Sequence, residues 1–175
     1  MERVIGAVEA LNRGLGRGVA WAALAMMLAQ AFSVVARYVF SDGVIAVQEA
    51  VVYGHALLFL GGSAYVLQLN QHVRVDVFYA AYRPGLKRLV DLVALVVFVV
   101  PVVVVILWVS LPYIARAWES LEGSRQAGGI PGVFLLKTAI AVFAVSVALQ
   151  ALATALRLIR GQPAPGWNAP PAQEP

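Results

Sequence analysis

The sequence predicts an all-α membrane protein with four transmembrane helices, and three observations lead to this fold class. First, 61% of its 175 residues are hydrophobic and 13% are charged, whereas soluble domains are about 45–50% apolar and about 25% charged. Second, the apolar residues gather in four runs, each close to the roughly 20 residues that cross about 30 Å of hydrocarbon. Third, most Lys and Arg residues flank these runs, as membrane topology requires.

The four runs are predicted to be helices, because an isolated strand cannot satisfy its backbone polar groups in hydrocarbon. The third run is rich in valine and would favour a strand in water, but its length favours a membrane helix. Pro101 lies at the middle of this run and predicts a kink. The predicted spans are about residues 18–38, 47–68, 89–111 and 133–156.

Two shorter segments are predicted to lie along the membrane surface. Before the first span, apolar residues recur at helical spacing among charged ones, which predicts a short amphipathic helix on the inner leaflet. These apolar residues are Val4, Ile5, Val8, Leu11 and Leu15. The second surface segment covers residues 73–82, ahead of the proline that opens the third span.

The domain organisation follows from the positions of the spans. Residues 1–160 are predicted to form a single four-helix membrane domain. Residues 161–175 contain five prolines, and we expect this tail to be disordered because it lacks the apolar residues that a packed core needs.

The distribution of basic residues predicts the orientation in the membrane. Nine of the 13 Lys and Arg residues lie before the first span, between the second and third spans, or after the fourth. The other four lie on the opposite side of the membrane. By the positive-inside rule, both termini are therefore predicted to be cytoplasmic, which agrees with the even number of spans.

The residue types present exclude several classes of function. The chain has no cysteine, and it contains no phosphate-binding loop, zinc motif or nucleophile with a base. We therefore predict no catalytic residue, no cofactor and no metal site. The basic excess flanks apolar runs, so it does not indicate nucleic-acid binding. The sequence also has no run of intramembrane carboxylates, no paired broken helices and no inverted repeat, which a self-sufficient ion-coupled transporter would have. This indicates an accessory subunit.

Three polar residues inside the spans carry specific expectations. Arg37 ends the first span and Glu49 begins the second, which favours an ion pair across the hairpin over two charges that separately reach the interface. His55 is predicted to be a hydrogen-bonding interior residue. The other histidine, His72, lies 17 residues further along, roughly 25 Å on a helix, so the two histidines cannot ligate one haem.

Several short motifs, in order along the chain, resemble the small (Q, DctQ-like) membrane subunit of TRAP transporters. The resemblance covers about residues 15–157. One departure is visible at residues 47–50, where the family often has a Trp and two acidic residues but this chain keeps one acid. The matching motifs are Arg37-Tyr38-Val39-Phe40, Gln48-Glu49, Gln71-His72-Val73-Arg74-Val75-Asp76, Trp118-Glu119-Ser120, Gly128-Gly129-Ile130-Pro131 and Lys137.

The resemblance implies a subunit of a tripartite, ATP-independent uptake system in a bacterial or archaeal inner membrane. In that family an extracytoplasmic binding protein delivers an organic acid, and a large membrane subunit moves it with an ion gradient, usually of sodium. The small subunit is implied to be a scaffold that braces the large one.

The same resemblance implies roles for two groups of residues. The first group is expected to act in folding and assembly, and the second to contact the binding protein, unless its loop is simply solvated. The assembly residues are Arg37, Glu49, His72, Arg74, Asp76 and Lys137. The residues of the expected contact are Trp118, Glu119, Glu122 and Arg125.

Two other functions fit the same residues. The chain could anchor a redox complex, with His55 as one haem ligand and a partner supplying the other. It could also form a small homo-oligomeric channel or exporter. A haem absorbance band would support the first alternative, and transport by the chain alone in liposomes would support the second.

Overall fold

The computed structural model describes residues 2–41, 43–73 and 77–162, and these residues form helices joined by short connectors. Four stretches are long and apolar enough to cross a membrane, which confirms the predicted fold class. The elements are α1 (Glu2–Val39), α2 (Ile45–Gln68), a 3-10 turn η1 (Tyr79–Ala81), α3 (Pro84–Val93), a π-helical segment η2 (Ala94–Val99), α4 (Val100–Glu119) and α5 (Val133–Ile159).

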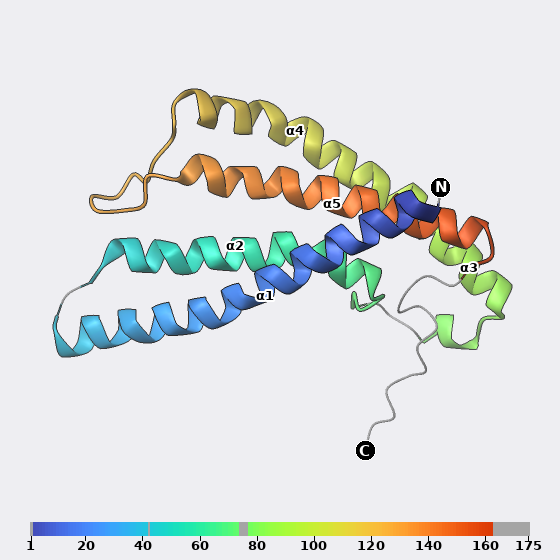
Figure 1. Cartoon of the computed structure of the whole chain (residues 1–175), viewed down its shortest axis with the longest axis horizontal. Helices are drawn as coiled ribbons and strands as arrows, with labels where there is room; N and C mark the ends of the chain where they lie inside the picture. The colour runs from blue at the N-terminus through green and yellow to red at the C-terminus, as the bar shows by residue number, and fades with distance from the viewer. Residues whose placement is uncertain (1, 42, 74–76, 163–175) are drawn as a thin grey trace, which may run out of the picture.

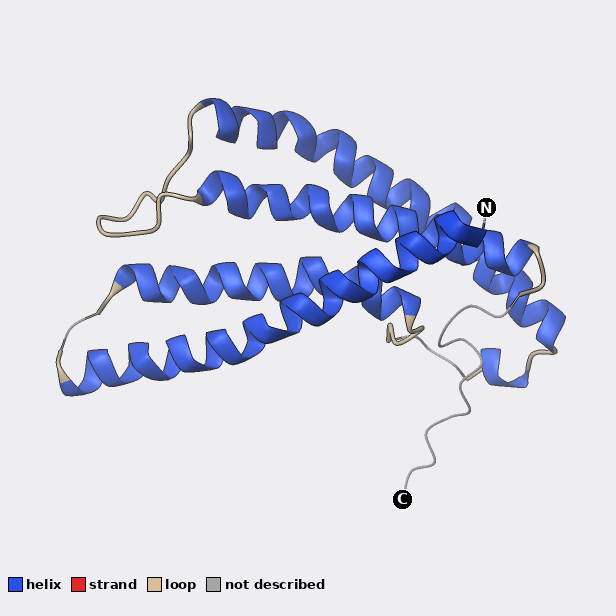
Figure 2. Cartoon of the chain, in the orientation of Figure 1, coloured by secondary structure: helices blue, strands red, loops and turns tan. Residues whose placement is uncertain are grey.

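The helices are arranged as a layer in the order α4, α5, α2 and α1 (Figure 1). Towards its first residues α1 crosses over to reach α5 (Figures 1 and 2). In the most apolar 18-residue stretch of α5, 50% of the residues are buried within the chain. The corresponding share is 11% in each of the other three spans. The fourth span is therefore the centre of the fold.

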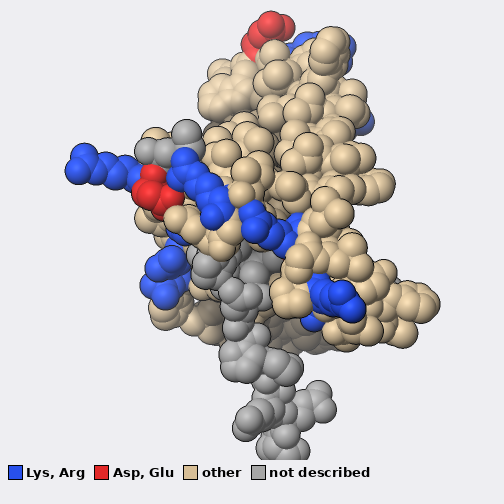
Figure 3. All heavy atoms as spheres, turned by 90° about the vertical axis from the view of Figure 1, so that its right-hand side faces the viewer, with Lys and Arg blue, Asp and Glu red and all other residues tan. Residues whose placement is uncertain are grey.

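The two ends of the molecule differ in what they carry. One end, called the hairpin end below, holds the α1–α2 loop and the α4–α5 connector (Figure 1). The other, called the terminal end, holds the start of α1 and the end of α5. Figure 3 looks onto the terminal end, where Lys and Arg side chains are spread over the surface.

The core lies on the faces that α2, α4 and α5 turn towards one another, and small residues supply much of it. Alanines at 64, 144, 151 and 155 are buried there, with Leu67, Val103 and Val147. Small side chains let helix backbones approach closely, which favours association in a membrane. The α1–α2 contact uses the same principle, because a Cβ at Gly61 would lie 3.0 Å from Cγ1 of Val19.

The predicted surface helix before the first span is wrong: α1 is one continuous helix of 38 residues. No proline interrupts it, so nothing in the backbone ends the helix between the two predicted segments. The face that it buries carries Ile5, Glu9, Asn12 and Gly16. Val4 and Leu11 of the predicted apolar face stay 66% and 62% exposed. The face that carries Glu9 and Asn12 packs on the protein because the bonding partners of these two side chains lie on α5.

The third span is longer than predicted and changes its helical pitch before Pro101. Helix runs from Pro84 to Glu119, and the π-helical segment precedes the proline. Proline has no N–H and its ring crowds the preceding turn, so a widened turn relieves the crowding where a kink was predicted. Of the predicted surface segment 73–82, the structure describes residue 73 and residues 77–82, which include the short turn η1.

Candidate functional site

Glu49, in the first turns of α2, fastens the α4–α5 connector to the hairpin end. Its carboxylate accepts a hydrogen bond from the hydroxyl of Ser124 and one from the backbone N–H of Ile130, the latter at 2.6 Å. Gly128 has φ +79°, which favours glycine, and a Cβ at Gly129 would lie 2.8 Å from Oε1 of Glu49. The Gly-Gly pair of the sequence motif therefore lets the connector reach this carboxylate.

The predicted ion pair between Arg37 and Glu49 is not formed. Glu49 faces the connector, and within the described part of the chain Arg37 makes no ion pair and is exposed. The physical reason is that Glu49 satisfies an otherwise orphaned backbone N–H, and charge-assisted hydrogen bonds to fixed donors are strong. The sequence could not reveal this choice, since Ser124 and Ile130 lie 75 and 81 residues away.

Lys137, at the start of α5, is the second anchor of the connector. Its ammonium forms a salt bridge with Glu122 and lies 3.8 Å from the centroid of the Tyr113 ring. The lysine side chain is 11% exposed, so the carboxylate and the ring replace most of its water. Tyr113, which the sequence motifs did not indicate, completes this site by a cation–π contact.

Trp118 joins α4 to α5 and is not simply an exposed loop residue. Its indole N–H donates to Oγ1 of Thr138 at 2.9 Å, and its ring meets that of Phe134 edge-on at 4.7 Å between centroids. Of the four residues expected to contact a binding protein, Trp118 thus joins α4 to α5, and Glu122 attaches the connector to Lys137. Glu119 and Arg125 remain as exposed charges.

At the terminal end, two ion pairs connect α1 to α5. Glu9 accepts a bidentate pair of hydrogen bonds from Arg157, at 2.6 and 2.8 Å, and its side chain is 6% exposed. Glu2 pairs with Arg160 at 2.8 Å, but this pair is much more exposed. Sequence reasoning missed both pairs, because it treated the acids of this segment as a solvated face.

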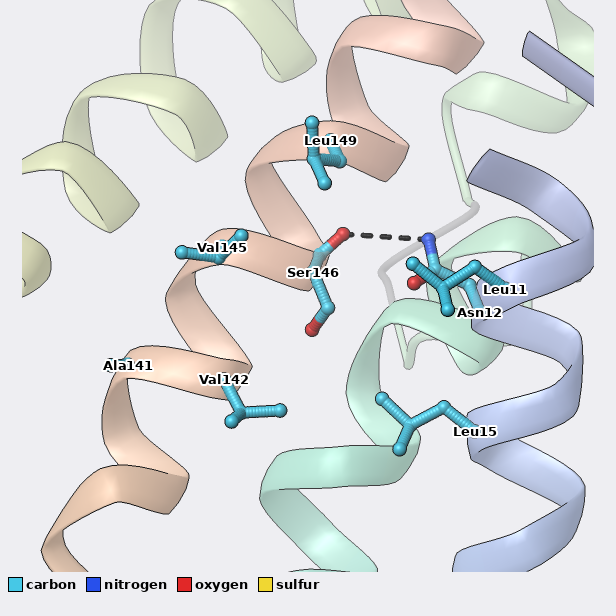
Figure 4. A pocket seen from close by; sticks show the side chains of 8 residues that line it. All are labelled: Leu11, Asn12, Leu15, Ala141, Val142, Val145, Ser146 and Leu149. Atoms are coloured by element: carbon cyan, nitrogen blue, oxygen red, sulfur yellow. Dashed lines mark hydrogen bonds between the residues drawn. The ribbon is translucent and has the colours of Figure 1, made fainter. Parts of the chain in front are cut away.

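A buried amide cluster lies one turn further along the same contact. Asn12 donates through Nδ2 to Oε1 of Gln150 at 2.9 Å, and Gln150 donates to Thr154 at 3.2 Å. Figure 4 shows Asn12 of α1 pointing at α5, where Nδ2 also lies 3.5 Å from the Ser146 carbonyl oxygen, among leucine and valine side chains. The sequence held one sign of this contact: Glu9 and Asn12 lie on one face of their helix, and Gln150 and Arg157 lie on one face of theirs.

The structure describes part of the polar segment 70–76 that follows α2. Asn70 has φ +56° where the chain turns away from α2, and the exposed His72 lines an apolar cavity of about 420 Å³ that Phe98 and Phe143 also line. Arg74 and Asp76, two of the predicted assembly residues, lie outside the described residues. The structure therefore shows His72 at the junction of α2, η2, α4 and α5, without assigning a role to it.

A further group of polar contacts lies at the terminal end, around the start of α3. The hydroxyl of Tyr79 donates to the buried Asp91 at 2.6 Å, and the Lys87 ammonium lies 5.4 Å from the Tyr79 ring. Arg88 donates to the carbonyl oxygen of Ile159 at 2.6 Å, which satisfies one of the orphaned carbonyl groups at the end of α5. The first two contacts attach η1 to α3, and the Arg88 bond attaches the start of the third span to the end of the fourth.

His55, which the sequence predicted to be an interior residue, is not part of the polar clusters described above. His55 is exposed on α2 and lies against Phe59, with 4.4 Å between ring centroids, so its predicted interior position is wrong. The buried residues of α2 are Gly61, Ala64, Leu67 and Gln68 instead. Among the described residues, no group of three or more His, Cys, Asp or Glu is placed to hold a metal ion.

The sequence was also compared with known proteins. The sequence model of one family matches residues 26–161, and that family is described as the DctQ component of tripartite ATP-independent periplasmic transporters. Neither a curated protein nor a solved structure matches the chain.

Proposed function

The chain belongs to the DctQ family, the small membrane components of tripartite ATP-independent periplasmic transporters, and from this premise we propose that it is the fixed scaffold of such a transporter. The family and the four apolar helices make it a multi-pass inner-membrane protein. In the proposed role it braces the large membrane subunit, which uses an ion gradient to move the substrate.

One observation carries this proposal: polar side chains fasten the helices to one another at both ends of the layer. Glu49 and Lys137 secure the hairpin end, and Glu9 with Arg157 secures the terminal end. Polar contacts across helices in lipid are worth about 0.6 kcal/mol on average, and a buried bidentate ion pair is costly to break. A layer secured at both ends resists tilting of its helices, as a support for a moving partner must.

The exposed apolar surface supports docking of the large subunit. α1 and α4 form the two edges of the layer (Figure 1), and Trp21 and Trp108 on these helices are 73% and 79% exposed. Aromatic side chains are enriched in the cores of protein interfaces. We propose that the large subunit covers one of these edges and that lipid surrounds the rest.

The finer parts of the proposal concern orientation, substrate and third partner. The Lys and Arg residues at the terminal end (Figure 3) favour a cytoplasmic position for both termini. The hairpin end then faces the periplasm, where Glu119 and Arg125 are available to an extracytoplasmic binding protein. That protein delivers an organic acid, and sodium drives its uptake through the large subunit.

Co-purification from native membranes tests the scaffold proposal. A tagged chain should retain a large multi-span membrane protein in mild detergent, in a constant ratio after size-exclusion chromatography. Elution of the chain as a homo-oligomer without any larger membrane protein would contradict the proposal and favour the self-contained channel.

A further inference from the structure

The hairpin end has a cavity between α1 and α2, and neither Glu49 nor Lys137 lines it. Its volume is about 410 Å³, and polar and apolar side chains share its lining. On α1 the lining residues recur every three or four positions along one helix face, and on α2 they occupy the first two turns. The residues that matter here are Gln30, Ser33, Val34, Arg37, Gln48 and Val51.

Arg37 supplies the charge of this cavity. The hairpin carboxylate that would neutralise it, Glu49, is bonded to the α4–α5 connector. A Cβ at Gly43 would lie 3.8 Å from Nη2 of Arg37 and 3.9 Å from Nε2 of Gln48, so both groups gather beside a residue that has no side chain. The cavity thus presents a guanidinium and an amide donor together.

The depth of Arg37 in the membrane is indicated by its neighbours. It lies in the last turn of α1, next to the exposed aromatic rings of Tyr38 and Phe40. Tyrosine is enriched at the level of the lipid headgroups because its ring is amphipathic. A long basic side chain at the end of a span reaches the headgroup level, where phosphate groups lie. A guanidinium matches the oxygens of a phosphate in a bidentate way.

The rest of the lining fits the remainder of a lipid molecule. Ser33 lies one helical turn below Arg37, about 6 Å deeper, and its side chain belongs to the cavity lining. Val34 and Val52, which also line the cavity, are 46% and 57% exposed, so they leave an apolar surface beside it. A cationic group at headgroup depth above apolar residues is the arrangement that an anionic amphiphile requires.

We propose that this cavity binds one glycerophospholipid, with the phosphate on Arg37 and Gln48 and an acyl chain along the valines. The phosphate chemistry could also attract free phosphate, and an acidic side chain of a partner could also meet Arg37. The mixed polar and apolar lining favours the lipid over both. This inference does not depend on the scaffold role, since it concerns the contact of α1 and α2 with the bilayer.

Native mass spectrometry of the full chain in mild detergent tests the proposal with defined probes. The probes are dioleoyl phosphatidylglycerol, dioleoylglycerol with the same acyl chains, and inorganic phosphate. We expect one phosphatidylglycerol per chain to be retained and neither other probe to bind. Retention of dioleoylglycerol to the same degree, or binding of inorganic phosphate with the same affinity, would overturn the proposal.

Variants of Arg37 assign the binding to this cavity. Arg37→Gln should lower phosphatidylglycerol affinity about 10-fold or more, the usual effect of losing hydrogen bonds to a charged group, and Arg37→Lys should lie between it and the wild type. The matched control is Arg116→Gln, because Arg116 lies near the same end on α4, is exposed and bonds to the carbonyl oxygen of Pro112. Helical circular dichroism checks the fold of each variant.

The results separate the lipid from a protein partner. If Arg37→Gln and Arg116→Gln retain phosphatidylglycerol equally, the proposed site is wrong. If Arg37→Gln keeps the lipid and instead releases a co-purifying membrane protein, Arg37 meets an acidic group of that partner and the lipid proposal is likewise overturned.

Discussion

At the hairpin end, Glu49 connects α2 to the α4–α5 connector. A carboxylate near the start of a membrane helix would ordinarily sit near its positive pole or pair with a neighbouring cation. Here it accepts hydrogen bonds from two groups of a connector that lies far along the chain. Glu49 therefore helps to determine where the loop between α4 and α5 is placed, together with the Lys137–Glu122 salt bridge.

The first prediction follows from the Ile130 N–H. Glu49→Ala should lower the free energy of unfolding by about 1–3 kcal/mol, because it leaves a part-buried donor without its acceptor. The midpoint of thermal unfolding in detergent, followed by circular dichroism, measures the change. Glu119→Ala is the control, since Glu119 is an exposed carboxylate at the end of α4; equal destabilisation by both substitutions would contradict the proposed role of Glu49.

His72 carries the second prediction at this scale. We propose that it supports assembly, because it lines the cavity where α2, η2, α4 and α5 meet. His72→Ala should reduce the amount of complex recovered with the large subunit and leave the substrate affinity of the assembled complex unchanged. Quantitative pull-down and a substrate titration of the remaining complex measure the two effects. A changed affinity with normal recovery would argue against a structural role.

At the scale of elements, the contact of α1 with α5 depends on polar groups in the turns of α1 that precede the first predicted span. The sequence pattern there showed an apolar stripe, and the stripe predicted a separate surface helix. The structure instead buries a mixed face of Ile5, Glu9, Asn12 and Gly16, because Glu9 and Asn12 bond to Arg157 and Gln150 on α5. Amphipathic spacing shows that a helix has two faces, but it does not show what each face will meet.

The third prediction compares the two ion pairs of this contact. Arg157→Met should destabilise the fold by about 3–5 kcal/mol, because it leaves the Glu9 carboxylate buried without a partner. Arg160→Met should cost about 1 kcal/mol or less, since its pair with Glu2 is exposed. Thermal unfolding of both variants in the same detergent measures the difference.

A double variant checks the cause of that difference. Glu9→Gln combined with Arg157→Met should recover part of the stability lost in Arg157→Met, because the unpaired charge is then removed. No recovery would mean that the arginine acts through packing of its side chain and not through the charge of Glu9.

The spans themselves were predictable because hydrophobic length alone determines them. α2 and α5 begin and end within three residues of the predicted bounds. The contacts of Glu49, Lys137 and Trp118 were not predictable, although their sequence motifs were visible. Each contact depends on which helices become neighbours in space, and a single sequence does not state the neighbours of a membrane helix whose apolar residues lie on all sides.

At the scale of the whole molecule, the layer has one central helix and two apolar edges. α5 contacts α4, α2 and the first turns of α1, so a change in its position would reach each of them. The polar contacts at the two ends limit such changes. A thin layer with large exposed apolar side chains is expected to bury part of them against a partner. In the proposed function this partner is the large membrane subunit.

Reconstituted transport is the most direct test of the scaffold function. The large subunit would be placed in liposomes with and without this chain, and sodium-driven uptake of the substrate from its binding protein would be measured. The account predicts uptake with both membrane subunits, none by this chain alone, and little or none by the large subunit alone. Full uptake by the large subunit in the absence of this chain would contradict it.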